Sequence, residues 1–339
     1  MADKAATMRD VAQLAGVSIQ TVSYVVNGKG VISPKTRERV QDAIDRLNYR
    51  RDPIARSMRT KQTRLIGLLV LDITNPVLSV IASAVEATAF EHDYKVILQN
   101  IGMEAAREKE YLVESAGSLI DGLIIVNSVD RESTLEFLEA QQITAVLIDC
   151  LSSTTIPSVA VDNVQAAYIA TRHAIELGHQ RIAHIAGSSS LLIAQQRQQG
   201  YLQALADHNL AYERIIVSKN ERWDYQAGYD TMVELLQDRT LPTAVFAASD
   251  QMAIGAYQAI AQAGLKVPED FSVIGFDDME AAQFAVPALT TIRQPFTEIA
   301  LSAVSLLLQL ISGDKPETTQ IILSPELVVR HSTRRLHDR

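Results

Sequence analysis

From Leu65 to the C-terminus, short apolar runs typical of β-strands alternate with amphipathic segments of helical length. Continuous runs of Ile, Val and Leu favour strands that are buried on both faces of a parallel sheet. Repeated strand–helix alternation restricts a chain to few architectures, of which the doubly wound α/β sheet is the simplest. Because residues 65–339 are too many for one comfortable sheet, we expect two lobes.

The expected elements follow the hydrophobic pattern closely. Strands are expected at 65–71, 94–99, 122–126, 145–149, 181–186, 215–217, 244–247 and 272–276. Helices are expected near 76–92, 105–118, 163–177, 195–208, 225–237, 250–263 and 295–312.

The charge of the chain is divided unevenly. The net charge is −9, but residues 1–64 carry 13 Lys or Arg against 6 Asp or Glu, and the remainder carries 18 against 34. A basic module of +7 on an acidic body of −16 indicates a polyanionic partner for the module and a different role for the body.

The basic module has the pattern of three short helices. Thr7 and Asp10 can form a capping box, and Gly16 ends a first helix that carries Val11, Leu14 and Ala15. Ser18 can cap a second helix, 19–26, and Ser33 with Pro34 can start a third. Two helices joined by a tight turn at Gly16 are a helix-turn-helix, and the third helix would complete its core.

The exposed face of the second helix can contact base edges, while neighbouring basic residues supply phosphate contacts. The alternative is an ordinary solvated surface, which the surrounding positive charge disfavours. Residues 50–63 then form either a linker or a short hinge helix, which would need a partner to be ordered.

Several spaced motifs agree with one known family. They are Met8-Arg9-Asp10-Val11-Ala12, Ala15-Gly16-Val17-Ser18, Thr21-Val22-Ser23, Val26-Asn27-Gly28, Thr36-Arg37, Leu47-Asn48-Tyr49 and Ala55-Arg56-Ser57-Met58. The chain resembles the lactose/galactose-repressor (LacI/GalR) family along nearly its whole length. The resemblance implies an all-α helix-turn-helix domain at 1–50, a hinge at 51–64 and a two-lobed periplasmic-binding-protein-like α/β core at 65–339. The lobes would comprise about 65–162 with 293–322, and 163–292 with 323–335.

The resemblance also implies which residues contact operator DNA. Ile19, Gln20 and Tyr24 fall at positions that set base specificity, and Met58 at the position of an apolar side chain inserted into the minor groove. Many relatives have Arg where this chain has Tyr24, so we expect a different preferred half-site. The expected DNA-binding residues are Ser18, Ile19, Gln20, Thr21, Ser23, Tyr24, Asn27, Lys35, Thr36, Arg37, Ala55 and Met58.

A ligand cleft is expected between the lobes, because ligands bind beyond the carboxyl ends of strands in open α/β sheets. Each acidic residue at a strand end could instead cap a helix or form a turn, and Asp250 is the clearest such cap. The resemblance assigns Arg197, Asp277 and Trp223 to effector binding, a set that suits a sugar or a nucleobase. The expected effector-binding residues are Asp72, Val77, Leu78, Asp149, Arg197, Trp223, Ser249 and Asp277. Val77, Leu78 and the 191–193 segment are more aliphatic than in many sugar-binding relatives, so an effector with an apolar portion, or no effector, stays open.

Three functions are compatible with part or all of these features. A ligand-responsive transcription regulator, expected to be a homodimeric repressor on a pseudo-palindromic operator, accounts for both the basic module and the core. A solute-binding protein would account for the core alone. An enzyme is disfavoured because the chain has no phosphate-binding, metalloprotease or nucleophile-elbow motif.

Composition supports a cytoplasmic protein. Cys150 is the only cysteine, which excludes an internal disulfide, and no apolar run reaches the length of a membrane span. The N-terminus lacks the apolar segment of a secretory signal, and no cofactor, metal or membrane partner is expected.

Overall fold

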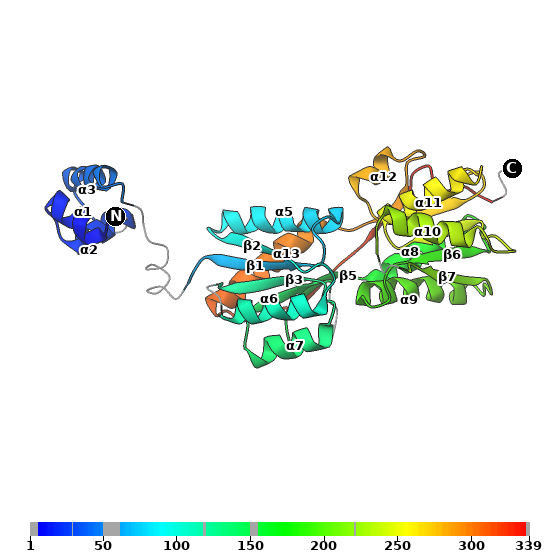
Figure 1. Cartoon of the computed structure of the whole chain (residues 1–339), viewed down its shortest axis with the longest axis horizontal. Coiled ribbons are helices and arrows are strands. Elements are labelled where there is room, and N and C mark those ends of the chain that lie inside the picture. The colour runs from blue at the N-terminus through cyan, green and yellow to red at the C-terminus, as the bar shows by residue number, and fades with distance from the viewer. Residues whose placement is uncertain are drawn as a thin grey trace. The chain divides into compact units, whose positions relative to one another are not determined.

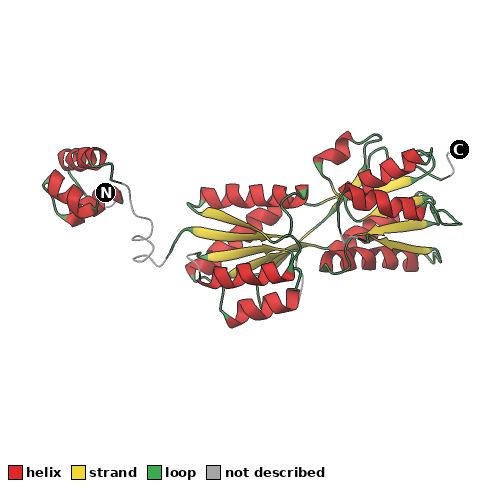
Figure 2. Cartoon of the chain, viewed as in Figure 1, coloured by secondary structure: helices red, strands yellow, loops and turns green. Residues whose placement is uncertain are grey.

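The computed structural model describes residues 6–28, 30–49, 62–117, 120–149, 155–219 and 222–336. Contacts within the chain divide it into two compact units, Met1–Thr63 and Arg64–Arg339. The first unit is helical and the second is built on two sheets (Figures 1 and 2). The expected fold class is confirmed: a helical N-terminal region and a two-sheet α/β core.

The first unit contains α1 (Met8–Ala15), α2 (Ile19–Val26) and α3 (Pro34–Arg46). The expected caps are present. Thr7 and Asp10 form the capping box of α1, and Ser18 and Ser33 accept hydrogen bonds from backbone amides in the first turns of α2 and α3. Gly16 ends α1 in the left-handed conformation, at φ +63°, which glycine adopts at little cost.

The three helices share one small core. Val11, Val22 and Val40 are fully buried in it, one from each helix. Arg39 of α3 donates to the carbonyl oxygen of Ala15 across 2.7 Å. This bond gives a partner to a carbonyl group at the C-terminal end of α1, which has none within the helix. Leu14 was expected on the apolar face of α1 but is 47% exposed. Ala12 takes its place in the core, because the buried face of α1 runs through Val11, Ala12 and Ala15.

The first lobe of the second unit has a parallel sheet in the order β11-β5-β4-β3-β1-β2. Its strands are β1 (Leu65–Val70), β2 (Lys95–Asn100), β3 (Gly122–Val126), β4 (Ala145–Ile148), β5 (Ser158–Val161) and β11 (Gln320–Leu323). Helices α5 (Pro76–Glu91) and α13 (Phe296–Ser312) cover one face, and α6 (Ala105–Gly117) and α7 (Arg131–Ala140) the other. The central strands β3 and β4 are buried along their whole length.

The second lobe has a sheet in the order β12-β10-β9-β8-β6-β7, in which only β12 is antiparallel. Its strands are β6 (Ile182–Ala186), β7 (Glu213–Val217), β8 (Ala244–Ala247), β9 (Ser272–Asp277), β10 (Thr290–Arg293) and β12 (Glu326–Val328). Helices α8 (Asn163–Glu176) and α9 (Leu192–Asp207) pack together on one face, and α10 (Tyr225–Leu235) and α11 (Asp250–Gln262) on the other. The short helix α12 (Glu280–Phe284) follows β9.

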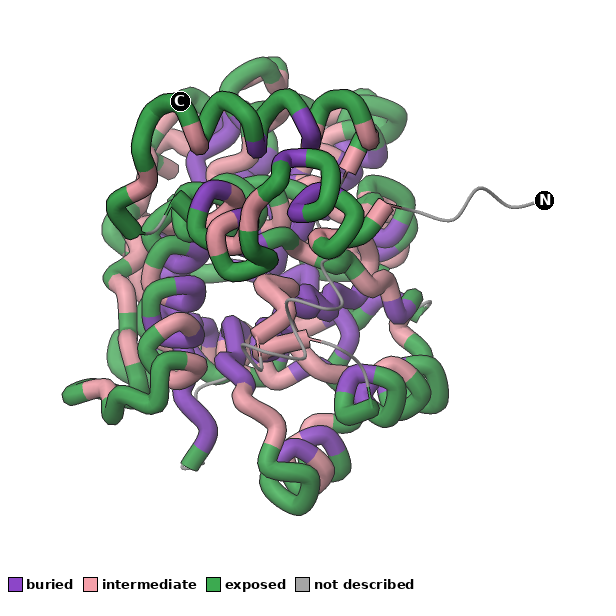
Figure 3. Tube along the Cα trace, turned by 90° about the vertical axis from the view of Figure 1, so that its left-hand side faces the viewer, coloured by how far each residue is buried: buried purple, intermediate pink, exposed green. Residues whose placement is uncertain are grey.

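The chain passes between the lobes three times, after β5, after β10 and after β11. Each lobe therefore contains segments that are distant in sequence, and the cleft between the lobes is lined from both. Buried residues concentrate on central strands such as β3 and β4, whereas the edge strand β2 is largely exposed. Figure 3 shows buried segments inside the molecule and exposed ones around its outside. Within the described residues, no helix combines the length and apolarity that a membrane span requires.

Six elements were not predicted from the hydrophobic pattern: β5, β10, β11, β12, α7 and α12. Helix α9 also begins at Leu192, three residues before the expected start. The four strands are three or four residues long, too short to show a clear period.

Candidate functional site

Helix α2 presents the residues expected to contact DNA bases. Ile19 and Tyr24 are 49% and 40% exposed, although both are large and apolar or aromatic. Gln20 is also exposed, and its side-chain amide donates to the Tyr24 hydroxyl across 2.9 Å. The helix therefore carries an exposed face with both apolar and hydrogen-bonding groups, as contact with base edges requires.

The other expected DNA-contacting residues lie at helix ends. Ser18 caps α2, and its hydroxyl lies 2.9 Å from the Thr21 hydroxyl. At the other end, the Asn27 amide donates to the Ser23 hydroxyl across 3.0 Å.

The first turn of α3 holds the charged members of the set. Lys35 and Arg37 are exposed there, and Thr36 lies 2.8 Å from the Ser33 hydroxyl. A helix N-terminus with two adjacent cations favours phosphate contacts. Ala55 and Met58 lie outside the described residues.

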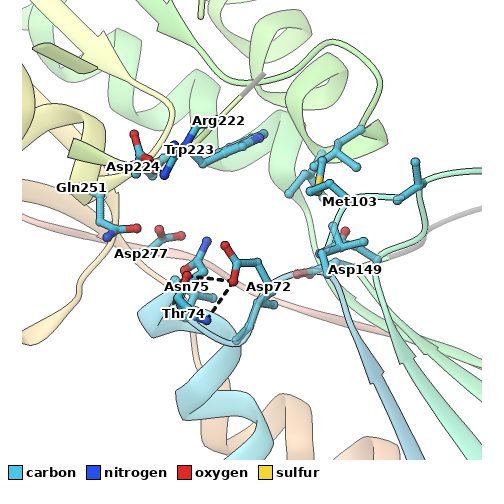
Figure 4. A pocket seen from close by; sticks show the side chains of 18 of the residues that line it. Asp72, Thr74, Asn75, Met103, Asp149, Arg222, Trp223, Asp224, Gln251 and Asp277 are labelled. Carbon is cyan, nitrogen blue, oxygen red and sulfur yellow. Dashed lines mark hydrogen bonds and ion pairs between the residues drawn. The ribbon is translucent and has the colours of Figure 1, made fainter. Parts of the chain in front are cut away.

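The second unit holds a cleft of about 600 Å³ between its two lobes. All eight residues expected to bind an effector line it: Asp72, Val77, Leu78, Asp149, Arg197, Trp223, Ser249 and Asp277. Figure 4 shows Arg222 and Trp223 on one side, facing Asp72 and Asn75 across the opening. The structure thus brings together residues that are more than 200 positions apart in the sequence.

Arg197 is the central cation of the cleft. Its side chain is 3% exposed and projects from α9. The guanidinium donates to Asn163 Oδ1 across 2.9 Å and to the Ala248 carbonyl oxygen across 2.5 Å. It also lies 3.6 Å from the centre of the Phe276 ring, which places the cation on the ring face. Arg197 is therefore held in one position before any ligand binds.

Two buried carboxylates lie around this guanidinium. Asp277 at the end of β9 is 3.9 Å from Arg197 and accepts a hydrogen bond from Gln294 across 2.8 Å. Burial raises the pKa of Asp277 to about 7, although Arg197 and Gln294 oppose the shift. Burial likewise raises the pKa of Asp149, against the charge of Arg197. The Arg197 guanidinium only partly offsets the cost of burying these two carboxylates, because a single cation lies near both.

Asp149 and Asp277 reach the cleft through unusual backbone conformations. Their φ angles are +59° and +115°, and Asn127 at the end of β3 has φ +60°. Positive φ is uncommon for residues with side chains, though Asn and Asp tolerate it best. These conformations turn the chain at the carboxyl ends of β3, β4 and β9, where the polar side chains gather.

Trp223 lies in the segment just before α10. Its ring packs on Gly187, and the Arg197 guanidinium is 5.4 Å from its centre. Ser249 caps α11, and its hydroxyl donates to the Trp223 carbonyl oxygen across 3.2 Å. The Asp72 carboxylate stabilises the turn that follows β1, because it accepts hydrogen bonds from the backbone amide and the hydroxyl of Thr74 (Figure 4).

An aliphatic surface completes the cleft. Val77 and Leu78 contribute from α5, and Leu191 and Ile193 from the start of α9. The side chains that the sequence marked as aliphatic therefore face the cleft from both lobes. Together with Trp223 they leave room for a ligand with an apolar face.

Some residues of the site were not expected from the sequence. Asn163, Phe276 and Gln294 position Arg197 and Asp277, and the packing of α8 on α9 and the pairing of β9 with β10 bring them there. Asp250 was expected to cap α11, but the cap is Ser249. The Asp250 carboxylate is instead buried, accepting from the Met279 amide and the Thr291 hydroxyl.

A helix-turn-helix unit followed by a two-lobed core with a polar, partly aliphatic cleft defines a DNA-binding regulator of the ligand-responsive class. Comparison with known proteins gives the family. Residues 7–52 match the model of bacterial regulatory proteins of the lacI family, and residues 171–333 match a periplasmic binding protein-like domain.

Full-length relatives agree with this assignment. The ribose operon repressor of Haemophilus influenzae is 35% identical over 96% of this chain and 98% of its own. The HTH-type transcriptional repressor PurR of Vibrio campbellii is 36% identical over 98% of this chain and all of its own. A crystal structure of the lac repressor dimer bound to operator and the anti-inducer ONPF superposes with a TM-score of 0.89, at 32% identity, covering 98% of this chain and 100% of that one. The chain belongs to the lacI family of bacterial regulatory proteins.

Proposed function

We propose that this protein is a transcriptional repressor that binds a pseudo-palindromic operator as a homodimer and responds to a small molecule in the interlobe cleft. The observation that carries the proposal is the exposed face of α2, with Ile19, Gln20 and Tyr24, on a unit joined to a core with a ligand-sized cleft. The relatives are repressors, and one of them binds operator as a dimer. The protein acts in the cytoplasm and catalyses no reaction.

The proposal assigns a role to each part of the chain. Residues 1–50 bind DNA, and residues 65–339 bind the effector and form the dimer. Residues 51–64 are the hinge that connects these two parts. Base contacts come from α2, while Lys35 and Arg37 at the start of α3 contact phosphates. Phosphate contacts supply affinity and base contacts supply specificity, so the two sets should respond differently to mutation.

The effector is proposed to be a sugar or sugar derivative. Arg197 and Asp277 offer hydrogen-bond donors and acceptors, and Trp223 with Val77 offers a surface for C–H groups. A nucleoside would use the same groups, with its base against the apolar surface. A regulator that has no small-molecule effector is the remaining alternative.

Selection from random duplex DNA tests the DNA-binding role. The purified protein should enrich a sequence with two inverted half-sites, and Gln20→Ala should lower affinity for that sequence while sparing binding to unrelated DNA. Gln41→Ala is the matched control, because Gln41 is exposed in the middle of α3 and its amide donates to Asp45 within the same helix. Enrichment of no sequence would contradict the proposal.

Effector action is tested by reciprocity. If a ligand changes operator affinity by some factor, operator must change ligand affinity by the same factor. Equal ligand affinities with and without operator DNA would show that the cleft does not control DNA binding.

A further inference from the structure

Arg64 is the first residue of the second unit, and three interactions hold it at the start of β1. Its backbone amide donates to Asp121 Oδ2 across 2.9 Å. Its guanidinium carbon lies 4.9 Å from the centre of the Tyr94 ring, and Nη1 donates to the His92 carbonyl oxygen across 3.5 Å. A guanidinium at this distance from a tyrosine ring is attracted to it. Arg64 is therefore held through both its backbone and its side chain.

The order of the strands brings these residues together. Arg64, Tyr94 and Asp121 immediately precede β1, β2 and β3, which are neighbours in the sheet in the order β2-β1-β3 (Figure 1). Strand β1 pairs in parallel with both neighbours, so the three residues meet at one end of the sheet. The Arg64 carbonyl oxygen also accepts from the Lys95 amide across 2.9 Å. The backbone of Arg64 is thus bonded to residues on both sides of β1.

Tyr94 anchors this set in the core of the first lobe. It is 4% exposed and belongs to the same buried cluster as Ile66 and Val85. Burial raises the pKa of Tyr94, the positive charge of Arg64 lowers it, and the Asp121 carboxylate raises it. The hydroxyl therefore stays protonated at neutral pH and interacts with both of these side chains. Because close-packed interiors resist displacement, the position of this ring helps to fix the position of Arg64.

The backbone of Arg64 has a conformation that this residue type rarely adopts. Its φ angle is +62°, in the left-handed region that is unfavourable for residues with a Cβ. Such a conformation persists only where the surrounding contacts impose it. It sets the direction in which residue 63 and the chain before it leave the sheet. The contacts of Arg64 therefore act at the point where the core joins the chain that leads to the DNA-binding unit.

An operator with two half-sites makes this direction important for function. The two DNA-binding units of a homodimer must reach half-sites at a fixed separation. Once one unit is bound, the second binds according to its effective concentration near its own half-site, which the connecting chain determines. A connection whose starting direction is already fixed loses less freedom on binding than one that is free.

We propose that Arg64 is a positioning residue for operator binding. Held by Tyr94 and Asp121, it fixes the direction in which the chain leaves the first lobe towards the DNA-binding unit, and so limits the half-site spacings that the dimer accepts. This inference rests on the proposed function of the protein as a dimeric operator-binding repressor. Arg64 itself makes no contact with DNA in this role.

Operators that differ only in half-site spacing test the proposal with the full chain. The probes are the duplex that the parent selects, the same half-sites moved closer or farther by about one to four base pairs, and a single half-site. Arg64→Gly removes the guanidinium and frees φ at this position. It should lower affinity for the selected operator roughly tenfold or more and flatten the dependence on spacing, with half-site affinity unchanged. The parent's spacing preference in this variant, or an equal loss on the half-site, overturns the proposal.

Two control variants separate positioning from the other effects of this substitution. Lys95→Gln removes a positive charge from an exposed residue that pairs with Leu65, and so measures the contribution of charge alone. Gln142→Gly places a glycine at an exposed residue with φ +52°, in the turn before β4 of the same sheet. Both should keep the parent's spacing preference. A flattening in either control as large as that in Arg64→Gly would also overturn the proposal.

Asp121 tests the positioning without any change in the connecting chain. Asp121→Ala removes the acceptor of the Arg64 amide and should flatten the spacing preference, whereas Asp121→Asn keeps an oxygen that can accept this bond and should remain close to the parent. If Asp121→Ala lowers only the stability to urea and keeps the spacing preference, the side chain stabilises the sheet without positioning the chain, and the proposal is overturned. A parent protein that selects no operator contradicts the proposed function itself, so the two failures are distinguishable.

Discussion

The Gln20 amide donates a hydrogen bond to the Tyr24 hydroxyl, one turn farther along α2, across 2.9 Å. The Tyr24 ring also packs against Gly30, where an added Cβ would lie 3.2 Å from the ring. Two positions expected to determine base specificity are therefore linked, and the ring is held against the turn that follows α2. The hydroxyl hydrogen of Tyr24 and the carbonyl oxygen of Gln20 stay available for base edges.

Tyr24→Arg should change the preferred half-site. Arginine can donate two hydrogen bonds to guanine, worth about 1–3 kcal/mol of discrimination, and tyrosine cannot make that pair. The change is measured by selecting operators from random DNA with each protein. Tyr24→Phe is the comparison variant, because it keeps the ring on Gly30 and removes only the hydroxyl, which bonds to Gln20 and is available to base edges. The same half-site for the parent and Tyr24→Arg would show that residue 24 does not contact a base.

The helix-turn-helix could be predicted in detail because its signals are local. Thr7 with Asp10, Ser18, and Ser33 with Pro34 each mark a helix start within a few residues of sequence. The missed elements lack such signals. Strand β10 contains Thr290, Thr291 and Arg293, and its place in the sheet depends on pairing with β9 and β12. Helix α7 buries only Thr134 and Leu138, too few apolar side chains to show a helical period.

The cleft was predictable only in part, for a related reason. Strand ends mark where polar side chains gather, so Asp149 and Asp277 could be chosen from their positions after apolar runs. The contacts of Gln294 with Asp277 and of Asn163 with Arg197 join residues 17 and 34 positions apart. No short-range pattern encodes such pairs, because one depends on the pairing of β9 with β10 and the other on the packing of α8 against α9.

Gly187→Ala should disturb the cleft through Trp223. An added Cβ would lie 2.2 Å from the Trp223 ring, so the indole must move. We expect a shift in Trp223 emission and at least a tenfold loss of effector affinity, with operator binding retained. Ser189→Ala, two residues away at an exposed position, should change neither property. Unchanged emission from Gly187→Ala would show that Trp223 does not pack on this strand end.

Gly255→Ala should destabilise the second lobe despite the higher helix propensity of alanine. The new Cβ would lie 2.0 Å from the Tyr225 carbonyl oxygen, where α10 and α11 pack closely. Overpacking of this kind costs roughly 1–3 kcal/mol, more than the ~1 kcal/mol gained by replacing a helical glycine. Gly117→Ala in α6 is the control, since no heavy atom lies within 4 Å of its added Cβ, and it should not lower stability. Urea unfolding measures both, and a Gly255→Ala protein as stable as its parent would contradict the close packing.

His184 should make the stability of the second lobe fall at acidic pH. Its ring is fully buried in β6 and stacks on Phe246, with ring centres 4.8 Å apart. Nδ1 lies 3.0 Å from the Phe246 carbonyl oxygen and must donate to it, while Nε2 has no partner among the described residues. Burial lowers the pKa of His184 from 6.5 to about 4.

The sign of the effect follows from that lowered pKa. Between pH 6.5 and about 4 the unfolded chain binds a proton at His184 that the folded chain does not. The stabilisation is therefore complete above pH 6.5 and is lost as the pH falls towards 4, by roughly 3 kcal/mol at most. His184→Gln keeps a donor for the Phe246 carbonyl but cannot titrate, so the unfolding free energy of this variant should depend less steeply on pH in that window. Ile185→Val on the same strand should lower stability by about 1 kcal/mol at every pH. Urea unfolding from pH 4 to 7 distinguishes the two variants. If the unfolding free energy of His184→Gln depends on pH as steeply as that of the parent, this ring is not the acid-sensitive group.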